Sequence, residues 1–215
     1  MSTLDTQTTQ PPRAKLAGVA LFTGPLFLAE VAVNSWLSRD YLHSHGWALR
    51  GGHDLPWPSM LALGPYGWAQ VLAFAVAGAG VLCAVPALAR TLPDRRRRWV
   101  AVTLVVMLGA GVALSAARVD ASMVAGQGAT TWHGLVHGLM FVVLLPTTVL
   151  APLAVAWAAR RDTRWRPIVM VSAFVPIGLI AAFVSRQGNL GFYLFLCIVF
   201  GWAAAVATTA ARLDR

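Results

Sequence analysis

"RTLPDRRRRWVAVTLVVMLGAGVAL", residues 90–114, decides the fold class of this chain, because five arginines are followed at once by an uncharged apolar run. The run continues to residue 117, and about 20 such residues are enough for a helix to cross a bilayer. Similar apolar windows lie at residues 16–37, 67–89, 132–158, 167–185 and 190–211. With the window at 99–117 they predict an all-α, polytopic membrane protein, a bundle of six transmembrane helices.

The overall composition also favours a membrane protein over a soluble one. Of the 215 residues 58% are hydrophobic and only 12% are charged, which is too apolar for a soluble domain of this length. A net charge of +9 would suggest a nucleic-acid partner in a soluble protein. Here the basic residues stand mostly between apolar windows, so we predict no nucleic-acid partner and interpret them as a topology signal.

The distribution of Lys and Arg predicts the orientation in the membrane. Six crossings place both termini on one side, and if that side is cytoplasmic it holds 13 of the 17 basic residues. The other four, on the external side, are Arg39, Arg50, Arg118 and Arg186. The positive-inside rule therefore predicts both termini cytoplasmic in a multi-pass protein of the cytoplasmic (plasma) membrane, with the N-terminus inside.

This topology also predicts the partners of the protein and the character of two segments outside the spans. The expected partners are membrane lipids and, in addition, a second copy in a homo-oligomer or a membrane partner protein. Residues 1–15 are polar and proline-containing, which predicts a disordered cytoplasmic N-terminus. Residues 38–66 form a long external loop between the first two spans, and loops of this length are often functional.

Candidate functional residues gather at the predicted external side. In "TWHGLVHGLM" (131–140), His133 and His137 lie one helical turn apart on one face. Glu30 and Asn34 have the same spacing near the outer end of the first span, and Asp120 follows the third span. A carboxylate inside a span needs a partner. We expect Glu30 to pair with His137 or His133, and with Asn34 or Asp120 as second choices, in a polar pocket partly covered by the 38–66 loop.

The histidine pair has three interpretations. The imidazoles could hydrogen-bond to neighbouring groups and fix helix packing, or they could serve as a proton relay or contact a substrate. Alternatively, His133 and His137 could bind zinc with a third ligand from Glu30, Asp120 or a loop histidine. The H-E-x-x-H pattern of zinc proteases is excluded, because Gly134 occupies the position of the glutamate.

Two segments resemble a known family. "HDLPWPSMLALGPYGWAQVLAFAVAGAG" (53–80) and "ARVDASMVAGQGATTWHGLVHGLMF" (117–141), together with the six-span layout, are similar to the DUF998 family of membrane proteins. The matching positions are Ser59, Gly64, Gly67, Asp120, Gly134 and His137. The resemblance implies the six-span architecture and these candidate residues, but no activity. A fainter similarity links the HxxxH pair to membrane hydrolases such as alkaline ceramidases, which have seven spans.

Two classes of function follow from these residues. The first is a binding, sensing or accessory membrane protein whose outer-leaflet polar pocket recognises a lipid headgroup or a partner helix. The alternative is a metal-dependent intramembrane hydrolase or transferase acting on a lipid-like substrate, with Glu30 or Asp120 as third ligand or general base. A transporter is a third option, although the spans contain no evident pair of broken helices.

Overall fold

The computed structural model describes residues 12–47, 56–184 and 189–214, and long helices dominate this part of the chain. The long helices are α1 (Pro12–Leu37), α3 (Gly67–Cys83), α5 (Arg95–Leu114), α7 (Trp132–Ala159), α8 (Arg166–Val184) and α9 (Asn189–Leu213). The short elements are α2 (Arg39–Ser44), η1 (Pro58–Leu63), α4 (Val85–Thr91), α6 (Ala121–Val124) and η2 (Thr163–Trp165). The predicted all-α class is confirmed, and no strand occurs among the described residues.

Six helical segments are long and apolar enough to cross a membrane, as the sequence predicts. They run over Gly18–Leu37, Gly67–Thr91, Arg95–Leu114, Trp132–Ala159, Thr163–Ala182 and Leu190–Leu213. Large apolar side chains on them point outward, for example Phe22, Val142 and Phe174, which are exposed by 64–67%. An apolar outer surface of this kind suits hydrocarbon rather than water.

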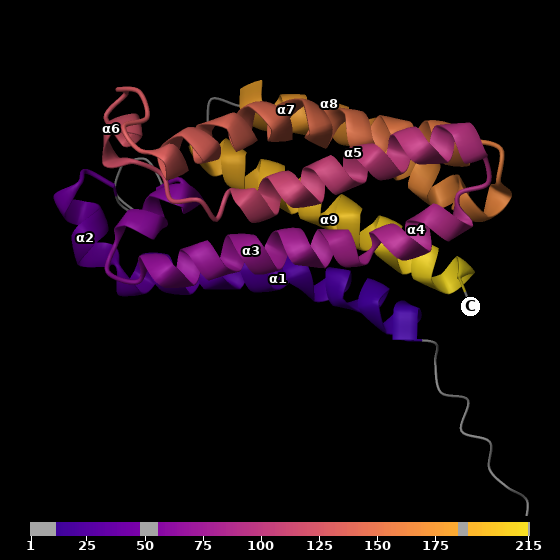
Figure 1. Ribbon diagram of the computed structural model, residues 1–215, viewed down its shortest axis with the longest axis horizontal. Coiled ribbons are helices and arrows are strands. Elements are labelled where there is room, and N and C mark those ends of the chain that lie inside the picture. Colours follow the sequence, from indigo (N-terminus) through magenta and orange to yellow (C-terminus); the bar gives the residue numbers. More distant parts are fainter. Residues whose placement is uncertain (1–11, 48–55, 185–188, 215) are drawn as a thin grey trace, which may run out of the picture.

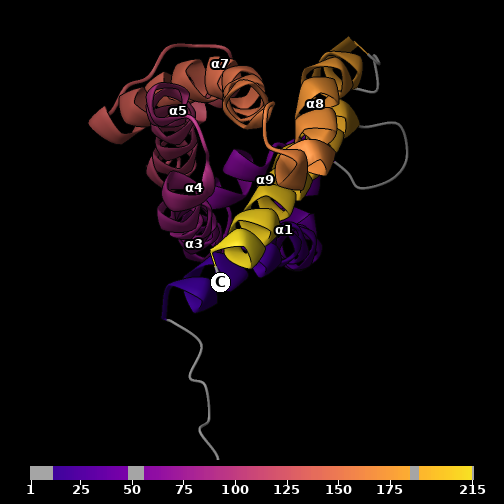
Figure 2. The same cartoon turned by 90° about the vertical axis from the view of Figure 1, so that its right-hand side faces the viewer.

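The six long helices form a closed ring. Each packs against its neighbour in the order α1, α3, α5, α7, α8 and α9, and α9 packs back against α1. Figure 1 shows that the helices run along the long axis and that α1 begins at the same end at which α9 finishes. Figure 2 shows α3, α5 and α7 on one side of the bundle, with α8, α9 and α1 on the other.

Small residues let α3 and α5 approach closely. A Cβ placed on Gly78 would lie 2.3 Å from the backbone nitrogen of Ala113 and 2.5 Å from the carbonyl oxygen of Gly109. Neither backbone atom could move aside without displacing α5. Gly78 is therefore required by the helix crossing, as expected where helices pack through small residues in an apolar solvent.

The two ends of the bundle differ in charge. The basic end carries the beginning of α1, the end of α9 and ten arginines whose side chains are described: Arg90, Arg95, Arg96, Arg97, Arg98, Arg160, Arg161, Arg164, Arg166 and Arg212. The site end carries α2, η1, α6 and the beginnings of α3, α7 and α9. Only Arg39 and Arg118 among the described basic residues lie there.

Helix boundaries at the basic end depart from the sequence windows. The third span begins at Arg95 rather than 99, because Asp94 caps α5 by accepting a hydrogen bond from the backbone nitrogen of Arg97 at 3.0 Å. The arginine run therefore forms the first turn of a helix. The second span is interrupted at Ala84, two residues before Pro86, which cannot donate a backbone hydrogen bond.

Candidate functional site

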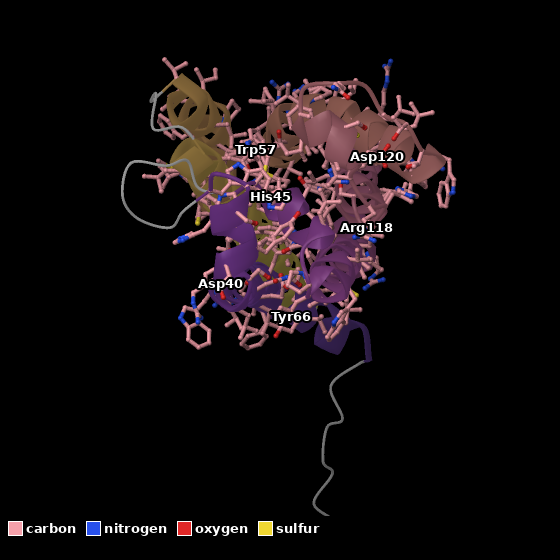
Figure 3. The ribbon with its side chains drawn as sticks, turned by 90° about the vertical axis from the view of Figure 1, so that its left-hand side faces the viewer. Asp40, His45, Trp57, Tyr66, Arg118 and Asp120 are labelled. Carbon is pink, nitrogen blue, oxygen red and sulfur yellow. The ribbon has the colours of Figure 1, made fainter. Side chains whose placement is uncertain are left out.

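The five predicted site residues all lie at the site end, but the structure distributes them over three places. Glu30 and Asn34 are on α1, Asp120 and His133 meet in the connection between α5 and α7, and His137 faces the interior of the bundle. Figure 3 looks at this end, with Asp120 at the upper right, Tyr66, the partner of Asn34, at the bottom, and Arg118 between them.

The first place is the Asn34 cluster, formed by Glu30, Asn34, Ser38 and Tyr66. The amide of Asn34 donates to Glu30 Oε1 at 3.0 Å and to the carbonyl oxygen of Tyr66 at 3.4 Å. The hydroxyl of Ser38 donates to Asn34 Oδ1 at 3.0 Å. Side chains one turn apart on α1 are thus joined in a row and tied to the beginning of α3.

Glu30 pairs with Asn34, its second-choice partner, and not with a histidine. The reason is topological, since α1 packs against α3 and α9 while the histidines are on α7, between α5 and α8. The other oxygen of Glu30, Oε2, is buried without a hydrogen-bond partner among the described residues, as are both amide atoms of Gln70. Gln70 on α3 is a buried polar residue that sequence reasoning did not single out.

The second place is the Asp120 cluster, formed by Asp120, Thr130 and Thr131. Asp120 is only 6% exposed. Its Oδ2 accepts from the backbone nitrogens of Thr130 at 2.7 Å and Thr131 at 2.8 Å. Its Oδ1 accepts from the Thr131 hydroxyl at 2.6 Å. These donors, the Thr131 hydroxyl first, lower the pKa of Asp120 from 3.8 to about 2 despite its burial.

The same cluster fixes the start of α7. The Thr131 hydroxyl accepts from the backbone nitrogen of Gly134 at 3.1 Å, which is an N-cap. A Cβ on Gly134 would lie 2.1 Å from Asp120 Oδ2. Gly134 is therefore needed so that the buried carboxylate can reach the first turn of α7.

The two histidines bind backbone carbonyl groups of the segment that follows α5. His133 Nδ1 lies 2.9 Å from the carbonyl oxygen of Arg118. His137 Nδ1 lies 2.8 Å from that of Ala117 and 3.1 Å from that of Ser115. A carbonyl can only accept, so Nδ1 carries the proton in both rings. Backbone carbonyls that follow α5 thus receive hydrogen bonds from two side chains of α7. This explains why an otherwise apolar segment contains two histidines.

His133 and His137 differ in what surrounds their second nitrogen. The His133 side chain is 35% exposed, and its Nδ1 lies 3.5 Å from Asp120 Oδ1. His137 is half-buried, with its ring edge-on to Phe74 at 6.3 Å between centroids. His137 Nε2 has no hydrogen-bond partner among the described residues, and in a neutral imidazole with Nδ1 protonated this atom is an acceptor.

The third place is a cavity inside the bundle, and His137 is the only one of the five predicted residues that lines it. The cavity has about 100 Å³ of free volume, compared with roughly 150 Å³ for an engineered apolar cavity that binds benzene. Its aromatic lining consists of Phe27, Trp57, Phe74, Phe141, Phe192, Phe195 and Phe200. On α7 it runs from His137 to Thr148, roughly 16 Å at ~1.5 Å per residue, so it is long and narrow.

Two residues of α7 that line the cavity also reach the outer surface of the bundle. They are Phe141 and Leu145, and each keeps 43% of its surface exposed. No residue of α8 lines the cavity. α7 and α8 come together at the basic end and diverge toward the site end (Figures 2 and 3).

The first connection closes the cavity at the site end. Trp57, Pro58 and Ser59 belong to its lining. The Trp57 ring lies 4.6 Å from that of Phe192, and the hydroxyl of Tyr193 donates to the carbonyl oxygen of Pro56 at 2.7 Å. These contacts hold η1 against α9. They also show that described parts of the predicted 38–66 loop are ordered into α2 and η1.

The predicted zinc site needs a third ligand beside His133 and His137, and the described part of the chain does not supply one. No group of three or more His, Cys, Asp and Glu side chains that could hold a metal occurs among those residues. His43 and His45 of the loop are exposed, while His53 and Asp54 lie outside the described residues. Zinc binding by His133 and His137 stays a prediction.

Sequence reasoning missed the residues that give the site its shape. Thr130 and Thr131 supply the donors to Asp120, and the aromatic residues of α9 supply much of the cavity wall. The threonines carried a usable signal, because Thr131 directly precedes a helical pattern as an N-cap residue does. The aromatic residues of α9 that line the cavity carried no such signal, since an aromatic residue in a span is equally suited to face lipid.

Comparison with known proteins gives one match. The model of a family described as "Protein of unknown function (DUF998)" matches residues 57–211, which include Asp120, both spanning histidines and most of the cavity lining. No curated protein and no solved structure matches the chain.

Proposed function

Since the chain belongs to the DUF998 family, whose description assigns no activity, the function has to come from its own residues, and we propose that it is a lipid-binding membrane protein. The bound part of the lipid is one apolar chain, held in the cavity between α7 and α9. The proposal gives the predicted binding or sensing role a specific place in the bundle.

The observation that carries the proposal is the setting of His137. Its Nδ1 is held by the Ala117 carbonyl at 2.8 Å, so the ring cannot turn freely. Its Nε2 has no hydrogen-bond partner among the described residues, and the residue lines a cavity that is otherwise mainly apolar. Binding sites of this kind, apolar with a few fixed polar groups, are typical for small molecules.

The proposed location is the cytoplasmic membrane with the termini inside. Ten described arginines at the basic end, against two at the site end, support this orientation by the positive-inside rule. The cavity then lies in the outer half of the membrane, and we propose that lipid enters it from the outer leaflet between α7 and α8, where Phe141 and Leu145 line the cavity and are also exposed.

Native mass spectrometry of the full chain, released from a mild detergent, tests lipid binding. Val112→Phe would fill the cavity from α5, because Val112 lines it. Val106→Phe on the same helix is the matched control, since Val106 is 38% exposed on the outer face. We expect a lipid adduct on the wild type and on Val106→Phe, and its loss in Val112→Phe. Equal adducts on all three would contradict the proposal.

A further inference from the structure

The polar end of the cavity is the strongest clue to the chemical class of the ligand. His137, Ser59 and Ser115 all line it. The Ser115 hydroxyl donates to the carbonyl oxygen of Gly111 at 2.8 Å, so toward the cavity it can only accept. His137 Nε2 is also an acceptor. Two of the three polar groups thus require a donor on the ligand.

No charged side chain lines the cavity among the described residues. The nearby described charges are engaged elsewhere: Arg118 Nε donates to the carbonyl oxygen of Ala62 at 2.8 Å, and the Asp120 carboxylate accepts from Thr130 and Thr131. Among the described lining groups, a phosphate or carboxylate headgroup would therefore find no cation and would face two groups that can only accept, His137 Nε2 and the Ser115 hydroxyl. Burying a charge without a partner costs far more than burying a hydrogen-bonded hydroxyl.

Resting on the proposed lipid binding, we infer that the ligand is an uncharged lipid whose polar end is a hydroxyl, such as a long-chain alcohol or an acylglycerol. The hydroxyl donates to His137 Nε2. The free hydroxyl of Ser59, which makes no hydrogen bond among the described residues, is placed to donate to the ligand oxygen. The chain extends along α7 toward Thr148, and it enters from the membrane beside Phe141.

The proposed entry along α7 and the closed site end of the cavity favour this ligand over a phospholipid. η1 covers the cavity at the site end and Tyr193 holds the preceding residue Pro56. A bulky zwitterionic headgroup would have to displace η1 to reach water. A single hydroxyl needs no water, because its hydrogen bonds are supplied within the cavity.

Photo-crosslinking of the full chain in nanodiscs tests this class. Three probes carry the same diazirine-bearing sixteen-carbon chain and differ only in their ends: hexadecanol, its methyl ether and the corresponding fatty acid. The ether keeps the oxygen but has no donor. We expect hexadecanol to label peptides of α7 and α9 about fivefold or more above the ether, the loss expected for one neutral hydrogen bond, and above the acid.

Two variants test whether the polar end of the cavity causes the preference for a probe with a hydrogen-bond donor. Ser59→Ala leaves every described contact intact and should lower labelling by the alcohol and by the ether alike, since both carry the oxygen to which Ser59 would donate, while His137→Ala should abolish the alcohol-to-ether preference. Equal labelling by alcohol and ether at the cavity peptides would overturn the hydroxyl inference and leave lipid binding standing. Preferred labelling by the fatty acid would also overturn the hydroxyl inference and leave lipid binding standing. Absence of cavity labelling by all three probes would overturn both proposals.

Discussion

The two ends of this bundle stabilise their connections with carboxylates in different ways. At the basic end, Asp94 caps α5 and pairs with the Arg97 side chain at 3.3 Å, and Asp162 pairs with Arg164 at 2.8 Å. At the site end, Asp120 accepts only from neutral groups apart from a histidine at 3.5 Å, and it is buried. The basic end combines backbone caps with partly exposed ion pairs, and exposed ion pairs contribute little and are screened by salt. The site end relies on oriented backbone and hydroxyl donors.

This difference indicates which end holds a fixed geometry. The Asp120 cluster and the histidines join the end of α5 to the start of α7, directly beside the cavity. If the comparison is right, changes at the site end should alter folding or binding strongly, and equivalent changes at the basic end should matter less.

The largest effect is expected from Gly134→Ala. The added Cβ would lie 2.1 Å from Asp120 Oδ2, so either the carboxylate or the start of α7 must move. We expect a loss of about 3 kcal/mol or folding failure. Gly138→Ala, one turn further along α7, is the control, because its Cβ would meet only the flexible end of Met123 at 3.2 Å. Thermal unfolding in detergent measures both, and equal midpoints would contradict the comparison.

The next effect concerns acid stability. The pKa of Asp120 is lowered from 3.8 to about 2 in the folded protein, so on acidification the unfolded chain takes up the proton first. The stabilisation from Asp120 is therefore complete above about pH 4 and is lost as the pH falls toward 2. Asp120→Asn should lower the unfolding midpoint at neutral pH and flatten its dependence between pH 4 and 2.

Asp94→Asn provides the contrast at the basic end. The backbone nitrogen of Arg97, and then its guanidinium, also lower the pKa of Asp94. Because the Asp94 side chain is 33% exposed while Asp120 is buried, we expect a smaller drop in the midpoint, and one that shrinks in 1 M salt. A salt-dependent effect at Asp120 and a salt-independent one at Asp94 would reverse the comparison.

A smaller difference is expected between the two histidines. His137→Ala removes the donor to two carbonyls in a half-buried setting, which should cost about 1–2 kcal/mol. His133→Ala exposes the Arg118 carbonyl where the side chain is already 35% exposed, so water can replace it and the cost should be under about 1 kcal/mol. Unfolding of the two variants in parallel checks the order. A larger loss for His133→Ala would contradict it.

The sequence was sufficient for the fold class because apolar length is a property of each segment alone. It also located the site end, since His133, His137 and Asp120 are rare polar residues in apolar surroundings. It could not pair them, because partners depend on which helices are neighbours. Glu30 and His137 are near the same predicted depth, but α1 and α7 are separated by α3 and α5 on one side and by α8 and α9 on the other.

The smallest effect is expected from metal removal. Both Nδ1 atoms are occupied by carbonyls, so a zinc ion would have to use Nε2 of each histidine, and a third ligand does not occur among the described residues. We expect treatment with a chelator to leave the unfolding midpoint unchanged in tag-free protein. A lower midpoint that zinc restores, together with one bound equivalent, would support the metal-dependent alternative instead.

The most direct test of the account is nitrogen NMR of the protein labelled with ¹⁵N-histidine, with His137→Gln used for assignment. The account predicts that His137 carries its proton on Nδ1, and that adding hexadecanol shifts the Nε2 resonance while the Nδ1 resonance stays nearly constant. A proton on Nε2, or an Nε2 resonance that does not respond to the alcohol, would contradict the claim that His137 is the polar contact of a lipid site.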